Sequence, residues 1–245
     1  MTKRGTARGW QFLRSVTERS ELAFLLGALL TIALAIGFIA LAGNVLEGDT
    51  QAFDERILAG LRKADNPSVP VGPWWLRTAA LDITALGSAT VLGLAVFGVV
   101  GFLLLQGSWR SALFVLAASN GGWVLNALLK QAFARARPDV VPHLREVMSL
   151  SFPSGHAMTS AAVYLTLGAL LMRIVDKPLA KFYCMGAAML VTFLVGATRV
   201  YLGVHYPTDV LAGWLLGLSW ALACWLIERA LERRAGLKRE RARAG

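Results

Sequence analysis

Residues 22–42 read LAFLLGALLTIALAIGFIALA, an apolar run of 21 residues without a single charge. A helix of about 20 residues crosses the hydrocarbon core of a bilayer, so this run predicts a transmembrane span. Five basic residues precede it, as they would precede the apolar part of a signal peptide. The run is too long for a signal peptide, however, and no small-residue cleavage site follows it, so we expect a retained span.

Five further apolar runs follow along the chain. They cover Ala80–Leu105, Ala112–Phe133, Ala157–Met172, Phe182–Thr198 and Val210–Ile227. With 56% hydrophobic and only 16% charged residues among 245, the composition excludes an ordinary soluble enzyme domain. The sequence therefore predicts an all-α integral membrane protein, a bundle of six transmembrane helices that forms one domain over residues 1–245.

The segment Gln51–Ala64, between the first two runs, has a different character. Phe53, Ile57, Leu58 and Leu61 recur at roughly helical spacing, and charged residues occupy positions between them. Such a pattern is typical of an amphipathic helix. We expect this helix to lie on the outer surface of the membrane.

The 25 Lys and Arg residues are shared unevenly between the two predicted faces. One face receives 16 of them, in the N-terminal segment 1–21, two short loops and the basic tail 229–245, and the other receives 9. The positive-inside rule then predicts that both termini are cytoplasmic. The net charge of +10 is concentrated in these segments, which favours contacts of the tail with anionic lipids over nucleic-acid binding. Together with the compact, loop-poor chain, the pattern indicates a bacterial inner membrane.

Two of the predicted outer loops hold the polar residues that membrane burial does not explain. Lys130, Arg137 and Arg199 lie at or near membrane depth, where an unpaired charge costs several kcal/mol. Arg presents a planar fork and Lys a point charge, which together suit a tetrahedral oxyanion. One such cation alone would be an interfacial anchor, but three of them beside two histidines predict an anion site. The acids in or beside these loops are Asp139, Glu146 and Asp209.

The sequence Pro153-Ser154-Gly155-His156 stands directly before the fourth apolar run. It should form the first turn of a helix, where free backbone N–H groups and the helix dipole favour an anion. Ser154 can add a hydroxyl donor or cap the helix, and Gly155 lets an anion approach the backbone closely. His156 follows immediately and supplies a titratable group at the same place.

His205 and Asp209 lie four residues apart at the start of the last run. In a helix beginning near Pro207, Asp209 could hold one imidazole nitrogen and leave the other free to attack an electrophile. A metal site built on His156 and His205 is the alternative. It is disfavoured because a dication would be repelled by three neighbouring cations. We expect no metal and no cofactor.

These residues resemble the signature of the type 2 phosphatidic acid phosphatase family, which belongs with the vanadium haloperoxidases in one superfamily. The signature is Lys-x6-Arg-Pro, then Pro-Ser-Gly-His, then Ser-Arg-x5-His-x3-Asp. The chain supplies all three parts in order, as Lys130 with Arg137-Pro138, Pro153 to His156, and Arg199 with His205 and Asp209. Thr198 stands where the family has serine.

The resemblance implies a metal-independent hydrolase of phosphate monoesters or diphosphates that forms a phosphohistidine. His205 would be the nucleophile, oriented by Asp209, and His156 the general acid and later the base. The phosphate oxygens would be held by Lys130, Arg137, Ser154, Gly155 and Arg199. Arg135, His143 and Arg145 match no family position, and we expect them to be loop or headgroup contacts.

The leading hypothesis is a lipid phosphatase with its active site at the periplasmic face. Candidate substrates are undecaprenyl diphosphate, phosphatidylglycerophosphate, phosphatidate and a lipid A phosphate. A lipid phosphotransferase would share every motif. A non-catalytic protein that binds or transports anionic lipids would need the cations but not the His205–Asp209 pair, and a soluble haloperoxidase is disfavoured by the six predicted spans.

Overall fold

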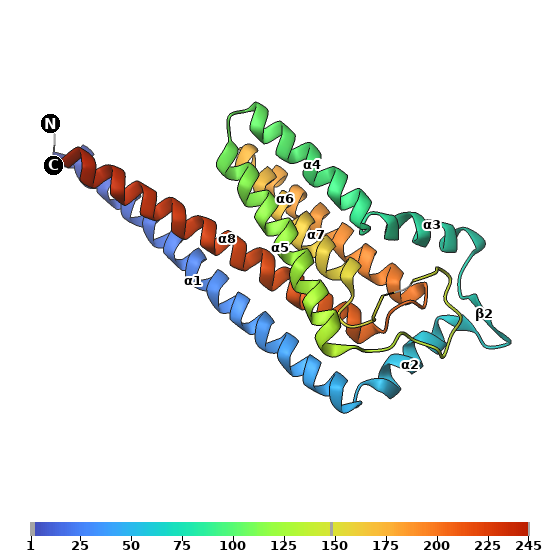
Figure 1. The fold of residues 1–245 in the computed structure, drawn as a ribbon. Helices are drawn as coiled ribbons and strands as arrows, with labels where there is room; N and C mark the ends of the chain where they lie inside the picture. The colour runs from blue at the N-terminus through green and yellow to red at the C-terminus, as the bar shows by residue number, and fades with distance from the viewer. Residues whose placement is uncertain (1–2, 148, 245) are drawn as a thin grey trace.

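The structure is a computed structural model that describes residues 3–147 and 149–244, with side chains for 21–147 and 149–235. Over these residues the chain forms eight helices and one short antiparallel hairpin (Figure 1). The helices are α1 (Lys3–Glu47), α2 (Gln51–Gly60), α3 (Trp74–Ala85), α4 (Ala89–Leu105), α5 (Trp109–Phe133), α6 (Gly155–Ile174), α7 (Pro178–Tyr201) and α8 (Pro207–Ala244). The strands are β1 (Arg62–Lys63) and β2 (Asn66–Pro70).

Five of the described helices are long and apolar enough to cross a membrane: α1 from Glu21, α5, α6, α7 and α8 as far as Ala235. The run predicted as one span over Ala80–Leu105 is divided between α3 and α4, which meet at an angle of 47°. Ser88 begins α4, because its Oγ accepts a hydrogen bond from the Val91 backbone N–H at 3.3 Å. The two helices together would make a sixth span, so the count of six stays a prediction.

Helix α6 packs against α5, α7 and α8, and two glycines allow its close approach to α8. A Cβ on Gly213 would lie 2.8 Å from the Ser154 carbonyl oxygen, and one on Gly217 would lie 2.5 Å from that of Met158. Glycines four residues apart permit this kind of backbone contact between membrane helices. The result is that the first turns of α6 and α8 lie against each other.

Three phenylalanine rings fix the segment that leads into α6. Phe152 is fully buried, and its ring packs on Phe38 of α1 and Phe133 of α5, with centroids 6.0 and 4.9 Å away. The burial of such large apolar rings is the main favourable contribution to the free energy that holds this loop in place. Residues 151–154 are thereby held between α1, α5 and α8.

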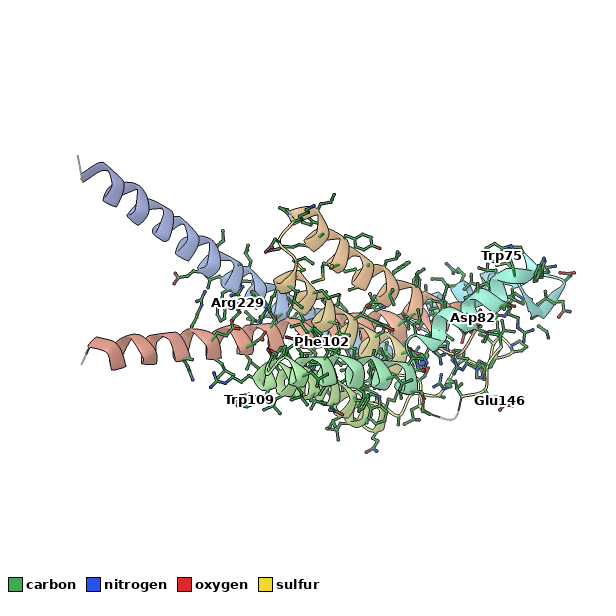
Figure 2. The ribbon with its side chains drawn as sticks, turned by 90° about the horizontal axis from the view of Figure 1, so that it is seen from above. Trp75, Asp82, Phe102, Trp109, Glu146 and Arg229 are labelled. Carbon is green, nitrogen blue, oxygen red and sulfur yellow. The ribbon has the colours of Figure 1, made fainter. Side chains whose placement is uncertain are left out.

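One end of the molecule collects the loops that carry the predicted chemistry. Helices α5 and α7 end there, α6 and α8 begin there, and α2 and the hairpin cover the same end (Figure 1). The start of α1 and the end of α8 lie at the opposite end. Viewed from above, these two long helices extend past the other helices and diverge (Figure 2).

Helix α2 is shorter than the predicted Gln51–Ala64, because residues 62–70 form the hairpin instead. It contacts α8, and Asp54 and Leu58 are its fully buried residues. Whether it lies on a membrane surface stays a prediction. Most of the basic residues that are predicted to be cytoplasmic belong to segments 1–20 and 236–245. Their side chains lie outside the described residues.

Candidate active site

The first turn of α6 lies at the centre of the site. Ser154 precedes the helix in an extended conformation, is fully buried, and donates its backbone N–H to the Asp209 carbonyl oxygen at 2.9 Å. A Cβ on Gly155 would lie 3.0 Å from Asn126 Oδ1 and 3.6 Å from Lys130 Cε. The absence of that Cβ leaves room for the Lys130 side chain beside N–H groups that have no partner within the helix.

The three predicted cations surround this turn from three elements. Lys130, in the last turn of α5, donates from Nζ to the Leu150 carbonyl oxygen. Arg137, in the loop, donates from Nε to the Ser149 carbonyl oxygen at 2.5 Å and from Nη1 to that of Val204. Burial lowers the pKa of Arg137 to about 10, which leaves the guanidinium charged at neutral pH.

Arg199 is the most deeply buried of the three, with 1% of its surface exposed. Its Nη1 donates to Thr84 Oγ1 of α3 at 3.1 Å, and Thr84 is itself fully buried. No sequence motif includes Thr84, which lies 115 residues away along the chain. The contact explains how α3 positions an arginine of α7.

His205 and Asp209 meet as predicted from their spacing. His205 Nδ1 lies 3.4 Å from Asp209 Oδ2 and 3.3 Å from Ser151 Oγ, and His205 Nε2 lies 3.3 Å from Arg137 Nη1. A guanidinium only donates, so Nε2 is the acceptor and Nδ1 carries the proton toward the carboxylate. Burial, and then Arg137, Arg199 and Lys130, lower the pKa of His205 well below its usual value. At neutral pH its Nε2 therefore presents a lone pair.

Asp209 is held by more partners than the sequence indicated. Oδ2 accepts hydrogen bonds from Ser151 Oγ and, at 2.9 Å, from the Tyr206 backbone N–H, while Oδ1 pairs with Arg135 Nη1 at 2.6 Å. The expectation that Arg135 is a loop or headgroup contact was therefore wrong. Its side chain is 12% exposed and joins two fully buried carboxylates.

The second carboxylate on Arg135 is Asp54 of α2. Arg135 Nη2 lies 2.9 Å from Asp54 Oδ2, and Thr208 donates to Asp54 from its backbone N–H at 3.0 Å and from Oγ1 at 2.5 Å. The guanidinium also lies over the Tyr206 ring, 4.2 Å from its centroid. Although burial alone would lower the pKa of Arg135, Asp209 and Asp54 raise it. A chain of contacts thus runs from His205 through Asp209 and Arg135 to Asp54.

Three buried polar atoms around the first turn of α6 have no hydrogen-bond partner among the described residues: Ser154 Oγ, His156 Nε2 and Arg199 Nε. Arg199, Arg137 and Arg145 lie near enough to His156 to interact with it electrostatically. A buried polar group without a partner is costly, and in a native structure it calls for a ligand or water. The chemistry of these atoms and of the surrounding cations fits an anion.

Two further predicted residues bond elsewhere. Thr198, at the position of the family serine, donates its hydroxyl to the Val195 carbonyl oxygen at 2.7 Å, within its own helix. His143 Nε2 lies 2.6 Å from the Pro138 carbonyl oxygen, which agrees with the expected loop contact. Within the described ranges, no group of three or more His, Cys, Asp or Glu side chains is arranged to hold a metal ion. The metal-free reaction stays a prediction.

Comparisons with known proteins agree on one family. The sequence model of one protein family, the PAP2 superfamily, matches residues 108–233. Phosphatidylglycerophosphatase B of Bacillus subtilis is 34% identical over 191 residues, which cover 76% of this chain and 89% of that protein. Lipid A 1-phosphatase of Rhizobium johnstonii is 33% identical over 47% of this chain and 46% of its own length. The crystal structure of a transmembrane PAP2 type phosphatidylglycerolphosphate phosphatase from B. subtilis matches with a TM-score of 0.72 and 30% identity, over 82% of this chain and 96% of that one.

Proposed function

The chain belongs to the PAP2 superfamily, and from that premise we propose that it is a membrane lipid phosphatase that hydrolyses a lipid phosphate or diphosphate through a phosphohistidine. The observation that carries the proposal is the group of unpartnered atoms Ser154 Oγ, His156 Nε2 and Arg199 Nε beside His205. The lipid phosphatases among its relatives support the class of substrate.

In the first step, His205 Nε2 attacks the terminal phosphorus, and the bond from that phosphorus to the leaving oxygen breaks. The leaving oxygen belongs to the lipid alcohol of a monoester or to the remaining lipid phosphate of a diphosphate. His156 donates a proton to that leaving oxygen. In the second step, His156 takes a proton from water, which attacks the phosphohistidine and releases inorganic phosphate with His205 restored. The negative oxygens are held throughout by Lys130, Arg137, Ser154, Gly155 and Arg199, as charge is redistributed in the transition state.

Arg135 and Asp54 position the catalytic carboxylate in this proposal. Asp209 must keep Nδ1–H of His205 in place and stabilise the positive charge that the ring acquires on attack. The bond from Arg135 to Asp209 Oδ1 leaves Oδ2 directed at His205. Asp54 holds the far side of the Arg135 guanidinium, so a residue of α2 supports the reaction without touching the substrate.

The long match to phosphatidylglycerophosphatase B favours phosphatidylglycerophosphate as the first substrate to try. Undecaprenyl diphosphate, phosphatidate and a lipid A phosphate remain candidates. We place the protein in a bacterial inner membrane with the site at the periplasmic face and both termini cytoplasmic. The uneven distribution of Lys and Arg supports that orientation.

The test is phosphate release by detergent-solubilised protein from these four lipids and from a soluble phosphate ester. We expect release from at least one lipid, fastest from phosphatidylglycerophosphate, and little from the soluble ester, because the site lies among membrane helices. No release from any lipid, with headgroup binding retained, would contradict hydrolysis. A product that appears only with a lipid acceptor would instead identify a phosphotransferase.

Chelation is expected to leave the rate unchanged within about twofold, because Lys130, Arg137 and Arg199 supply the positive charge that a metal ion supplies in other phosphatases. The measurement is phosphate release before and after incubation with EDTA, followed by removal of the chelator. Activity that is lost and then restored only by a divalent ion would rule out the metal-free mechanism.

A further inference from the structure

A groove of about 680 Å³ lies between α1, α6, α7 and α8, away from the candidate active site. Its volume is in the range that holds a drug-sized ligand. The walls are mainly apolar, and their larger side chains come from three helices. They include Leu165, Met185, Met189, Phe193, Trp214 and Leu218.

The length of this groove matches one leaflet of a bilayer. Its lining residues run from Ala161 to Arg173 on α6 and from Lys181 to Phe193 on α7, which is 12 residue-to-residue steps in each case. At about 1.5 Å per residue each stretch is about 18 Å long. Half of a hydrocarbon core of about 30 Å is about 15 Å. The groove therefore reaches from one membrane surface to about the midplane.

The two ends of the groove differ in charge. Arg173, Lys181 and Arg229 line it, and no described Asp or Glu side chain does. All three lie in the half of their helices remote from the site: Arg173 follows His156 by 17 residues on α6, about 25 Å along the axis. Figure 2 shows Arg229 at the end of the bundle that also holds Trp109, with Glu146 at the other end.

Two of these cations are available to a ligand. Arg173 is engaged by Glu228, with Nη2 2.5 Å from Oε2. Arg229 lies 4.0 Å from Glu232 and over the Trp225 ring, contacts that leave donors free. The half-buried side chain of Lys181 makes no hydrogen bond or ion pair with any described residue. An anionic headgroup would accept hydrogen bonds from the free donors of both Lys181 and Arg229.

We propose that the groove binds an anionic phospholipid of the leaflet opposite the active site. Its phosphate lies on Lys181 and Arg229, and an acyl chain lies along Met189 toward Trp214. A headgroup at that end is about 25 Å from the first turn of α6 and so is not a substrate. The bound lipid fills the space between α1 and α7 and stabilises the bundle. This inference does not depend on the chemistry proposed for His205.

The experiment titrates the purified full chain with dioleoylphosphatidylglycerol or dioleoylphosphatidylcholine and counts bound lipid by native mass spectrometry. We expect the wild type to bind phosphatidylglycerol more tightly and to gain thermal stability from it. Lys181→Gln/Arg229→Gln should weaken binding at least about tenfold, since each removes a contact with the phosphate. Met189→Trp keeps the charges but fills the apolar groove, and it should weaken binding as well.

The matched control is Arg110→Gln/Lys177→Gln, which removes two exposed cations that do not line the groove. It should bind phosphatidylglycerol like the wild type. Equal affinity of the wild type for phosphatidylglycerol and phosphatidylcholine would overturn the proposal. This comparison uses the wild-type protein alone. Unchanged binding in either groove variant, or an equal loss in the control, would overturn it too.

Discussion

Replacement of His205 by Ala is expected to lower the rate of lipid phosphate release by at least about 10³-fold, the scale of loss when a covalent nucleophile is removed. His205 is the ring whose Nε2 faces Arg137 while Nδ1 faces Asp209. Without it the phosphate can still bind to the cations, but no covalent intermediate can form. The measurement is single-turnover phosphate release, together with trapping of a phosphorylated protein.

The control for this variant is His143→Ala. His143 is exposed, and among the described residues its ring has a hydrogen-bond contact only with the Pro138 carbonyl oxygen, so its loss should leave the rate near that of the wild type. Because His205 is almost fully buried, the thermal unfolding of both variants should be compared. A folded His205→Ala protein with the wild-type rate would disprove the phosphohistidine mechanism.

Arg135→Ala is expected to reduce kcat by about 10²-fold or more with little change in KM, because Asp209 loses the group that directs it toward His205. The change also leaves Asp54 and Asp209 buried without their shared cation, which costs about 3–5 kcal/mol of stability. Arg135→Lys keeps a charge but cannot bridge both carboxylates, so it should recover only part of the rate.

The rates must be measured well below the unfolding midpoint of each variant, where a purely structural defect would not alter kcat. Arg56→Ala is the matched control, since Arg56 is an exposed arginine of α2 that makes no hydrogen bond or ion pair with a described residue. Asp54→Asn should also lower kcat, by a smaller factor than Arg135→Ala. A wild-type kcat in folded Arg135→Ala would show that the arginine serves only the fold.

The sequence motifs predicted which residues meet, but not what holds them there. Lys130, Ser154 and His205 come together because each stands at a helix end, and helix ends are readable from apolar runs. Thr84 and Asp54 lie outside every motif and bond to residues more than 80 positions away, so the motifs did not indicate them. For Asp54 a signal did exist, since it lies four residues before the buried Leu58, on the same face of α2.

The division between α3 and α4 shows a similar limit. The mean hydropathy in a sliding window stays high over all of Ala80–Leu105, because Gly87 and Ser88 lower it only slightly. The sequence therefore predicts one continuous span. In the structure, a Cβ on Gly87 would lie 2.4 Å from Val195 and 3.2 Å from His156. The chain turns there because α3 must approach α7 and the site, which is a tertiary requirement and not a local one.

The backbone contact of Gly213 and Gly217 with α6 has a consequence for how this fold diversifies. It makes the first turn of α6 and the His205–Asp209 pair one rigid block, while α4 lies outside this block and packs mainly on α5. Substitutions on the outward face of α4 can therefore change the outer surface of the bundle without disturbing the proposed reacting groups. Lineages that dephosphorylate different lipids can therefore share one unaltered reaction centre, and selection on the substrate acts on separate parts of the chain from selection on the chemistry.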